Sequence, residues 1–216
     1  MAERSNQGWY SHVEGIDLAG KSTQMRMARE YAEANGIPYL QVREPGETEL
    51  GVELRHQILT NRAHNLSART EAFMYMADRS HTLDTIVLPA LEKGITVTHD
   101  RAYNSTVAYQ AAAGGVSKEA IMSMMNTMFP KRYVEPDAIA VLAISKETYR
   151  LRRAEKADTL GLDKIEERDM VYFDKVIDEF ERIAIEHPSA VRVDGEMTPE
   201  EVFAVIRPLI FGPEHA

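Results

Sequence analysis

The sequence predicts an α/β protein: a three-layer α/β/α fold with a five-stranded parallel sheet flanked by helices and a short lid. Two observations lead to this fold class. Short apolar runs rich in β-branched residues alternate with longer amphipathic segments, and a glycine-rich motif stands between the first run and the first amphipathic segment. A chain of 216 residues is long enough for a sizeable core, so we expect residues 1–216 to form a single domain.

Five strands are expected where apolar and β-branched residues gather in short runs. They span residues 9–14, 38–42, 95–99, 138–144 and 190–193. Because amphipathic segments separate successive runs, the strands are expected to be parallel, with helices on both faces of the sheet.

Eight helices are expected from apolar residues that recur at intervals of three and four. They span residues 21–35, 48–60, 67–93, 105–113, 117–128, 146–156, 164–187 and 199–210. In the 67–93 helix, Ser67 can cap the start, and Pro89 is expected to kink the helix rather than end it. Thr198 and Glu201 form a capping-box pattern at the start of the last helix.

The composition excludes several classes of protein. The chain has no cysteine, which rules out disulfides, zinc–thiolate sites and cysteine nucleophiles. It carries 25 Lys+Arg against 34 Asp+Glu, a net charge of −9, and such a chain is a poor general partner for nucleic-acid polymers or anionic lipid. No apolar stretch reaches the roughly 18 residues of a membrane span, and the first residues lack a secretory signal. We expect a cytoplasmic protein that binds no membrane.

One motif carries a mechanism. Residues 15–22 read GIDLAGKS and fit G-x-x-x-x-G-K-[ST], the P-loop pattern, between an expected strand and an expected helix. Backbone N–H groups of such a loop bind phosphate oxygens, the Lys21 ammonium reaches the β- and γ-phosphates, and the Ser22 hydroxyl ligates Mg²⁺. The motif predicts a nucleoside triphosphate bound with Mg²⁺. The residues expected to hold it are Gly15, Asp17, Leu18, Ala19, Gly20, Lys21, Ser22 and Thr23.

The P-loop alone leaves three classes open: a small phosphotransferase, a switch GTPase and an ATP-driven machine. No guanine-reading N-K-x-D motif follows the loop, and no hydrophobic run ends in an Asp-Glu pair. The chain is also short for a motor ATPase. A small phosphotransferase is favoured, with an acceptor site elsewhere in the sequence.

Four segments, in order, resemble the thymidylate kinase family, whose members phosphorylate dTMP with ATP. EGIDLAGKSTQ at 14–24 resembles E-G-[IV]-D-x-A-G-K-[ST]-T, and REPG at 43–46 resembles R-E-P-G-G. EA at 71–72 with ADR at 77–79 resembles E-A-L-L-F-A-A-D-R, and DR at 100–101 with STVAYQ at 105–110 resembles D-R-x-x-x-S-[ST]-x-A-Y-Q. The resemblance covers roughly residues 9–207 and implies a P-loop kinase fold that uses ATP, Mg²⁺ and dTMP.

The resemblance also implies where the acceptor binds. Tyr75 and Arg79 are four residues apart and share one helix face, where the family stacks a ring on thymine and hydrogen-bonds its carbonyl oxygen. From spacing alone, a packed Tyr75 and a solvated Arg79 remain an alternative. Tyr109 is expected near the sugar 2′ position, and Gln110 or Ser105 near the base. The further residues expected to contact the acceptor are Asp17, Glu44, Arg101 and Thr106.

Charged side chains that bind the phosphates and the metal are expected just after the 95–99 strand, because ligands of open parallel sheets bind at the carboxyl ends of the strands. The resemblance implies that Arg101 holds the acceptor phosphate and that Asp100 orders Mg²⁺ or its water shell. A simple strand-end turn is the alternative for Asp100. Asp17, inside the P-loop, would act near the acceptor sugar and phosphate, and near the metal.

Residues 150–163, RLRRAEKADTLGLD, are expected to form a basic lid between two helices. Under the resemblance this lid closes over ATP, with Arg152 on the nucleotide and Arg153 on the transferring phosphoryl group; Lys156 is a third candidate cation. The alternative is a solvated helix end whose positive charges suit the C-terminal dipole.

The expected reaction is in-line phosphoryl transfer from MgATP to dTMP, giving dTDP and ADP. Because a phosphate monoester has a second pKa near 6, the acceptor oxygen is already anionic at pH 7 and no general base is required. The expected catalytic residues are Lys21, Arg101, Asp17 and Arg153. Two alternatives remain: a kinase for another deoxynucleoside monophosphate, and a non-catalytic P-loop protein. The resemblance also implies a homodimer.

Four residues depart from the family pattern: Tyr75 replaces a usual Phe, Ala102 replaces the common aromatic after D-R, and Leu18 and Glu47 affect the backbone or the charge of the site. Leu18 replaces the Gly or Arg of the family's P-loop, so the lid is expected to supply any catalytic arginine. Glu47 replaces the second Gly of R-E-P-G-G, which requires a backbone without positive φ or a strained one.

Overall fold

Five parallel strands form one sheet with the order β2-β3-β1-β4-β5. The computed structural model describes residues 7–215. The strands are β1 (Tyr10–Glu14), β2 (Tyr39–Arg43), β3 (Thr96–Asp100), β4 (Ala138–Ala143) and β5 (Ala190–Asp194). All five expected strands are confirmed, and their ends shift by no more than one residue. Because β1 and β3 are parallel neighbours, the segments that follow them meet at one edge of the sheet.

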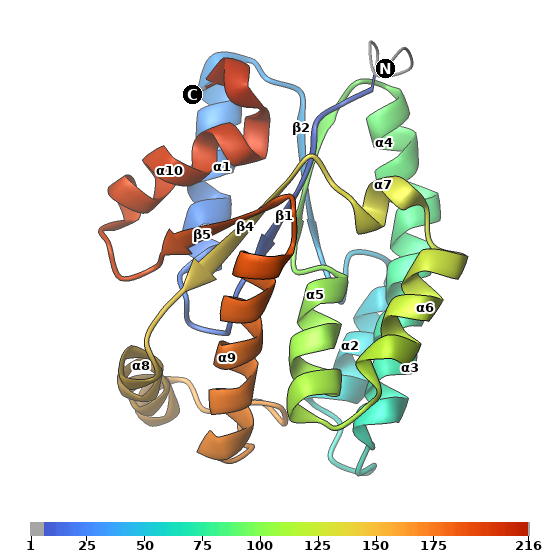
Figure 1. Ribbon diagram of the computed structural model, residues 1–216, viewed down its shortest axis with the longest axis vertical. Coiled ribbons are helices and arrows are strands. Elements are labelled where there is room, and N and C mark those ends of the chain that lie inside the picture. Colours follow the sequence, from blue (N-terminus) through green and yellow to red (C-terminus); the bar gives the residue numbers. More distant parts are fainter. Residues whose placement is uncertain (1–6, 216) are drawn as a thin grey trace.

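Helices cover both faces of the sheet, as Figure 1 shows. α1 (Lys21–Asn35) and α10 (Pro199–Phe211) pack together on one face. α9 (Met170–Glu186) packs against β4 and β5 on the other face, beside the helical stretch η2 (Val107–Ala113). The remaining helices are α2 (Glu49–Leu59), α3 (Ala68–Thr82), α4 (Leu88–Glu92), α5 (Tyr103–Thr106), α6 (Lys118–Met128), α7 (Lys131–Val134), α8 (Lys146–Thr159) and η3 (Pro213–His215). The predicted three-layer α/β/α fold is confirmed.

Side-chain caps begin several helices at the expected places. The Ser67 hydroxyl accepts a hydrogen bond from the Thr70 N–H at the start of α3. At the start of α10, the Thr198 hydroxyl accepts from the Glu201 N–H while the Glu201 carboxylate accepts from the Thr198 N–H, so the capping box is confirmed. Among the helices within residues 7–215, none is long and apolar enough to cross a membrane.

The 67–93 helix continues through Pro89, although its hydrogen bonding changes just before the proline. α3 is followed without a break by a π-helical stretch, η1 (Leu83–Val87), and then by α4. The Leu88 N–H bonds to the Leu83 carbonyl, one residue further back than in an α-helix. A second π-helical stretch, η2, continues α5 and carries Tyr109 and Gln110, two residues expected at the acceptor site.

The structure corrects the expected boundaries around the lid. α8 continues to Thr159, so the first ten residues of the expected 150–163 lid are helical. α9 begins at Met170 rather than at 164, with Asp169 as its N-cap. In the α8–α9 connection (residues 160–169), the Asp163 carboxylate accepts the N–H groups of Ile165 and Glu166, as an N-cap does, and the Glu167 N–H bonds to the Asp163 carbonyl oxygen. The helical pattern therefore gives only a short stretch of turns here before Asp169 caps α9. The short helix α7 is also absent from the sequence prediction.

Two histidines lie side by side in the buried centre of the sheet. His12 of β1 and His99 of β3 are partners in the strand register, and their rings stack with centroids 5.6 Å apart. Tyr10 and Tyr133 pack against both rings. Both histidines are fully buried, and neither ring forms a hydrogen bond with another described residue. Burial lowers the pKa of both imidazoles, that of His99 to about 3, so both rings are neutral in the folded protein.

Candidate active site

The P-loop lies between β1 and α1 at the carboxyl edge of the sheet and surrounds the Lys21 ammonium. Lys21 Nζ donates to the carbonyl oxygens of Gly15 and Ile16, both at 2.8 Å, and the side chain is almost fully buried. Burial, reinforced by the neighbouring Arg101 charge, lowers the pKa of Lys21 to about 8. A cation with few protein partners at this position suits a polyanionic ligand.

Two backbone conformations shape the loop. A Cβ at Gly15 would lie 2.4 Å from the Leu142 carbonyl oxygen, so only glycine allows this approach to β4. Leu18 has a φ of 66°, a left-handed conformation that is unusual for a branched side chain. Its carbonyl oxygen accepts a hydrogen bond from Arg152 Nη1 at 2.8 Å. Arg152 therefore reaches from α8 to the P-loop.

Arg101, Asp17 and Tyr109 form a close triangle next to the P-loop. Arg101 Nη2 lies 2.5 Å from Asp17 Oδ1, and the Tyr109 hydroxyl donates to Asp17 Oδ2 at 2.7 Å. Burial alone would raise the pKa of Asp17, but the Arg101 and Lys21 charges and the Tyr109 hydrogen bond outweigh it and hold that pKa well below its usual value. Each carboxylate oxygen of Asp17 thus accepts one hydrogen bond, and the pair of bonds orients the carboxylate toward Arg101 and Tyr109.

Glu14 is a positioning residue that sequence reasoning missed. Its carboxylate, buried at the end of β1, accepts the Ser105 hydroxyl at 2.6 Å and the Ala102 N–H at 2.9 Å. These bonds fix the start of α5 below Arg101, whose Nη1 lies 3.2 Å from the Ser105 hydroxyl oxygen. Burial raises the pKa of Glu14, while these partners counteract the rise. A charged residue at the end of an otherwise buried strand was the available signal.

A cavity of about 160 Å³ opens beside the P-loop, and we call it the site cavity. All nine residues expected to contact the acceptor line its wall, so the structure brings together four segments of the chain. They are Asp17, Glu44, Tyr75, Arg79, Arg101, Ser105, Thr106, Tyr109 and Gln110. Arg43 and Arg55 also line the site cavity and were not predicted to do so.

Arg79 is buried in the wall of the site cavity rather than solvated. Its Nε donates to Glu44 Oε2 at 2.8 Å and its Nη1 to the Thr106 hydroxyl at 3.2 Å. Burial would lower the pKa of Arg79, but Tyr133 and Glu44 reverse the effect and raise it, so the guanidinium stays charged. Tyr75, one helical turn earlier, lines the same cavity. The alternative of a solvated Arg79 is therefore wrong.

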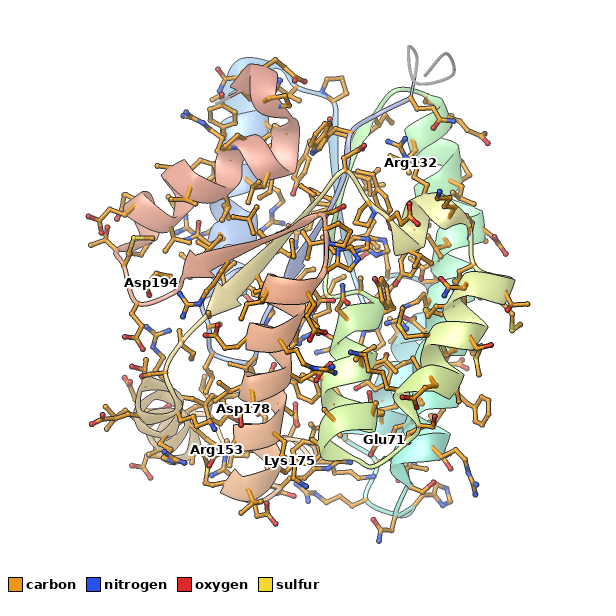
Figure 2. The ribbon with its side chains drawn as sticks, viewed as in Figure 1. Glu71, Arg132, Arg153, Lys175, Asp178 and Asp194 are labelled. Carbon is orange, nitrogen blue, oxygen red and sulfur yellow. The ribbon has the colours of Figure 1, made fainter. Side chains whose placement is uncertain are left out.

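The α8–α9 connection closes one side of the site cavity. Lys156 Nζ pairs with both carboxylate oxygens of Glu166 at 2.6 Å, and both residues line the cavity. Arg153, predicted to act on the transferring phosphoryl group, instead donates to the carbonyl oxygens of Glu166 and Arg168 and lies over the Phe173 ring. In this arrangement its donors hold the α8–α9 connection. Figure 2 shows Arg153, a residue of α8, at the end of the molecule that also holds Glu71.

The donor atoms available near the P-loop fit Mg²⁺. The Ser22 hydroxyl is exposed at the first turn of α1, and the Asp100 carboxylate lies at the end of β3 without a hydrogen bond to another described residue. Within residues 7–215 no cluster of three acidic or histidine side chains forms a metal cage. A hydroxyl and a single carboxylate suit Mg²⁺, which commonly retains water and binds substrate phosphates instead of filling an all-protein cage.

Comparisons with known proteins agree with this geometry. A family model described as thymidylate kinase matches residues 13–206. Thymidylate kinase from Gluconobacter oxydans (strain 621H) is 36% identical over 203 residues, which cover 94% of this chain and 94% of the relative. Thymidylate kinase from Caldicellulosiruptor saccharolyticus is 32% identical over 206 residues, covering 94% and 96%. The crystal structure of thymidylate kinase from Ehrlichia chaffeensis shares the fold, with a TM-score of 0.73 at 23% identity and coverage of 93% and 97%.

Proposed function

Because this chain belongs to the thymidylate kinase family, it phosphorylates dTMP with ATP, and we propose how its own residues perform that transfer. The observation that carries the proposal is the site cavity. The nine residues expected to contact the acceptor all line this one cavity, directly beside the P-loop. A single domain would contain the P-loop (residues 15–22), the site cavity and the lid, and these parts would act together in the transfer.

We assign the acceptor phosphate to Arg101. Its guanidinium is held between Asp17 and the Gly15 carbonyl oxygen, so it faces the P-loop with little freedom to move. Lys21 would then bind the phosphoryl group of ATP from the other side. Since the acceptor oxygen is already anionic at neutral pH, aligning the two polyanions and neutralising their charge are the main tasks of the protein. Asp17 acts here by orienting Arg101.

Ser22 and Asp100 are the residues we assign to Mg²⁺. When bound, the ion neutralises charge on the β- and γ-phosphates. Arg152 would support the nucleotide from α8, since it already contacts the P-loop carbonyl of Leu18. Arg153 would keep the α8–α9 connection in place over the site cavity, which replaces its predicted role on the transferring group.

The acceptor base would lie against Tyr75, with Arg79 donating to its carbonyl oxygen. Arg79 is suited to this role because Glu44 and Thr106 already bind its Nε and Nη1 and thereby fix the direction of the remaining donors. Tyr109, tied to Asp17, would stand near the sugar.

A cytoplasmic homodimer completes the proposal. Val52 on α2 and Phe73 on α3 each expose 57% of their surface, and these two helices pack against one another, so their outer faces offer apolar area for a second copy of the chain. Sedimentation of the wild-type chain and of a Phe73→Asp variant tests this part: the variant should lose the dimer, and a monomeric wild type would refute it.

The activity is tested by a coupled ATP assay over all nucleoside monophosphates. We expect dTMP to be the best acceptor, and a better rival acceptor would reject the assigned specificity. Arg79→Ala should raise the KM for dTMP at least about tenfold while the KM for ATP stays unchanged. Arg192→Ala, which removes an exposed arginine paired with Glu181, is the matched control and should leave both values unchanged.

A further inference from the structure

A chain of hydrogen bonds runs behind the site cavity and is centred on Glu71. This α3 residue is almost fully buried, and Figure 2 shows it at the lower end of the molecule. Its Oε2 accepts a hydrogen bond from Gln110 Nε2 at 3.1 Å, and its Oε1 pairs with Arg168 Nη2 from the α8–α9 connection. Sequence reasoning gave Glu71 no role.

Glu71 determines which way the Gln110 amide points. An ion-paired carboxylate has acceptors only, so the NH₂ end of the Gln110 amide has to face it. Gln110 also lines the site cavity, and its Oε1 forms no hydrogen bond with another described residue. The amide can therefore offer only an acceptor, Oε1, to a bound base.

Arg79 offers the opposite kind of atom in the same cavity. A guanidinium has donors only, and the Nε and Nη1 donors of Arg79 are used by Glu44 and Thr106. Its Nη2 group forms no hydrogen bond with another described residue. The wall of the site cavity thus combines a fixed donor with an acceptor whose orientation depends on Glu71.

We propose that Glu71 is a positioning residue for base specificity, which acts by holding the Gln110 amide with its oxygen toward the base. The inference rests on the proposed function, in which this cavity holds the nucleobase. Thymine presents an O4 acceptor beside an N3–H donor and matches the pair formed by Arg79 and Gln110. Cytosine presents an N4–H₂ donor beside an N3 acceptor and opposes both groups, so dCMP is rejected by two unfavourable contacts.

Arg168 ties this arrangement to the α8–α9 connection. Its guanidinium lies over the Tyr172 ring at 4.6 Å, its Nη1 lies 2.5 Å from the Tyr172 hydroxyl, and that hydroxyl donates to the Tyr109 carbonyl oxygen. Arg168 needs a hydrogen-bond acceptor from residue 71. It therefore also determines which end of an amide side chain at residue 71 would face it. In Glu71→Gln, the amide oxygen of the new side chain would bind Arg168 and its NH₂ would face Gln110. The Gln110 amide would then turn and present its NH₂ to the base.

The test measures binding of dTMP and dCMP by calorimetry, together with turnover of each in the coupled assay. Glu71→Gln should lower the ratio of dTMP to dCMP affinity at least about tenfold, mainly through weaker dTMP binding. The kcat at saturating dTMP and the KM for ATP should change little. In a Gln110→Ala background, adding Glu71→Gln should no longer change the ratio, because the group through which Glu71 acts is absent.

Two further variants keep the result interpretable. Glu179→Gln removes another buried, ion-paired carboxylate away from the site cavity and should leave the ratio unchanged. Arg168→Gln, at a partly exposed position, keeps the Glu71 carboxylate as an acceptor for the Gln110 amide and should also leave the ratio unchanged. Gln110→Ala removes the acceptor oxygen itself, so it should lower the ratio, and it serves if Glu71→Gln does not fold. An unchanged ratio in Glu71→Gln or in Gln110→Ala, or an equal fall on adding Glu71→Gln with and without Gln110, would overturn the proposal. A wild type that binds dTMP over dCMP without phosphorylating it would refute the proposed function alone.

Discussion

Removing the Glu44 carboxylate should be among the most destabilising single changes in the site. Arg79 Nε lies 2.8 Å from Glu44 Oε2, and each side chain exposes only 2% of its surface. Glu44→Ala leaves a permanently charged guanidinium buried, with the Thr106 hydroxyl as its remaining oxygen partner. Breaking such a buried pair costs about 3–5 kcal/mol of unfolding free energy. At about 2–4 °C per kcal/mol for a chain of this size, Tm should fall by roughly 6–20 °C.

Urea denaturation of four proteins measures this interaction: wild type, Glu44→Ala, Arg79→Met and the double variant. Because Arg79→Met removes the charge that needs a partner, Glu44→Ala should cost far less in that background than in the wild type. Glu44→Gln, which retains an acceptor oxygen for Arg79, should lose only about 1–3 kcal/mol. Equal costs of Glu44→Ala in the two backgrounds would show that the ion pair does not account for the stability.

Four other outcomes are expected. Since burial lowers the pKa of Lys21 to about 8, its charge is lost as pH rises through that value, and kcat/KM for ATP should fall between pH 8 and pH 9.5; a flat profile would contradict this. Ser22→Ala should raise the Mg²⁺ concentration for half-maximal turnover without changing dTMP affinity in calorimetry. Burial and the Glu44 charge raise the pKa of Asp78 to about 6, so the charged form destabilises the fold above that pH. Asp78→Asn should therefore add about 1–2 kcal/mol of unfolding free energy at pH 7.5 and less at pH 4.5, and an equal effect at both would refute the linkage. Thr198→Ala should cost about 1 kcal/mol in urea titrations through loss of the α10 cap.

Features with a local cause were predictable from the sequence. The strands follow from β-branched runs, and the P-loop from glycine spacing with its Lys-Ser pair. The residues expected to contact the acceptor came from the resemblance to the thymidylate kinase family, and they follow β1, β2 and β3 or lie on α3. Parallel strands then bring these segments to the same edge of the sheet, where they line the site cavity.

Features with a distant cause were not predictable. The 164–169 segment has a helical pattern, but it forms only turns after the Asp163 cap, with Glu166 turned inward to pair with Lys156. A second cap, Asp169, then begins α9. Glu14 and Glu71 are acids within apolar surroundings, and their partners come from segments far along the chain. Glu47 illustrates the same limit. It adopts no positive φ, and its carboxylate accepts the Arg43 N–H across the turn.

The stacked histidine pair at the centre of the sheet contributes to the protein's response to acid. Both imidazoles have pKa values below their ordinary value of about 6.5, with burial as the main cause and the Arg79 charge nearby. The unfolded chain therefore binds protons that the folded chain excludes, between about pH 6.5 and the lower folded pKa values. Unfolding in that range takes up protons at His12 and His99, so stability is lost as pH falls below about 6.5. The same two rings that fill the centre of the sheet thus make the fold of the kinase less stable in acid.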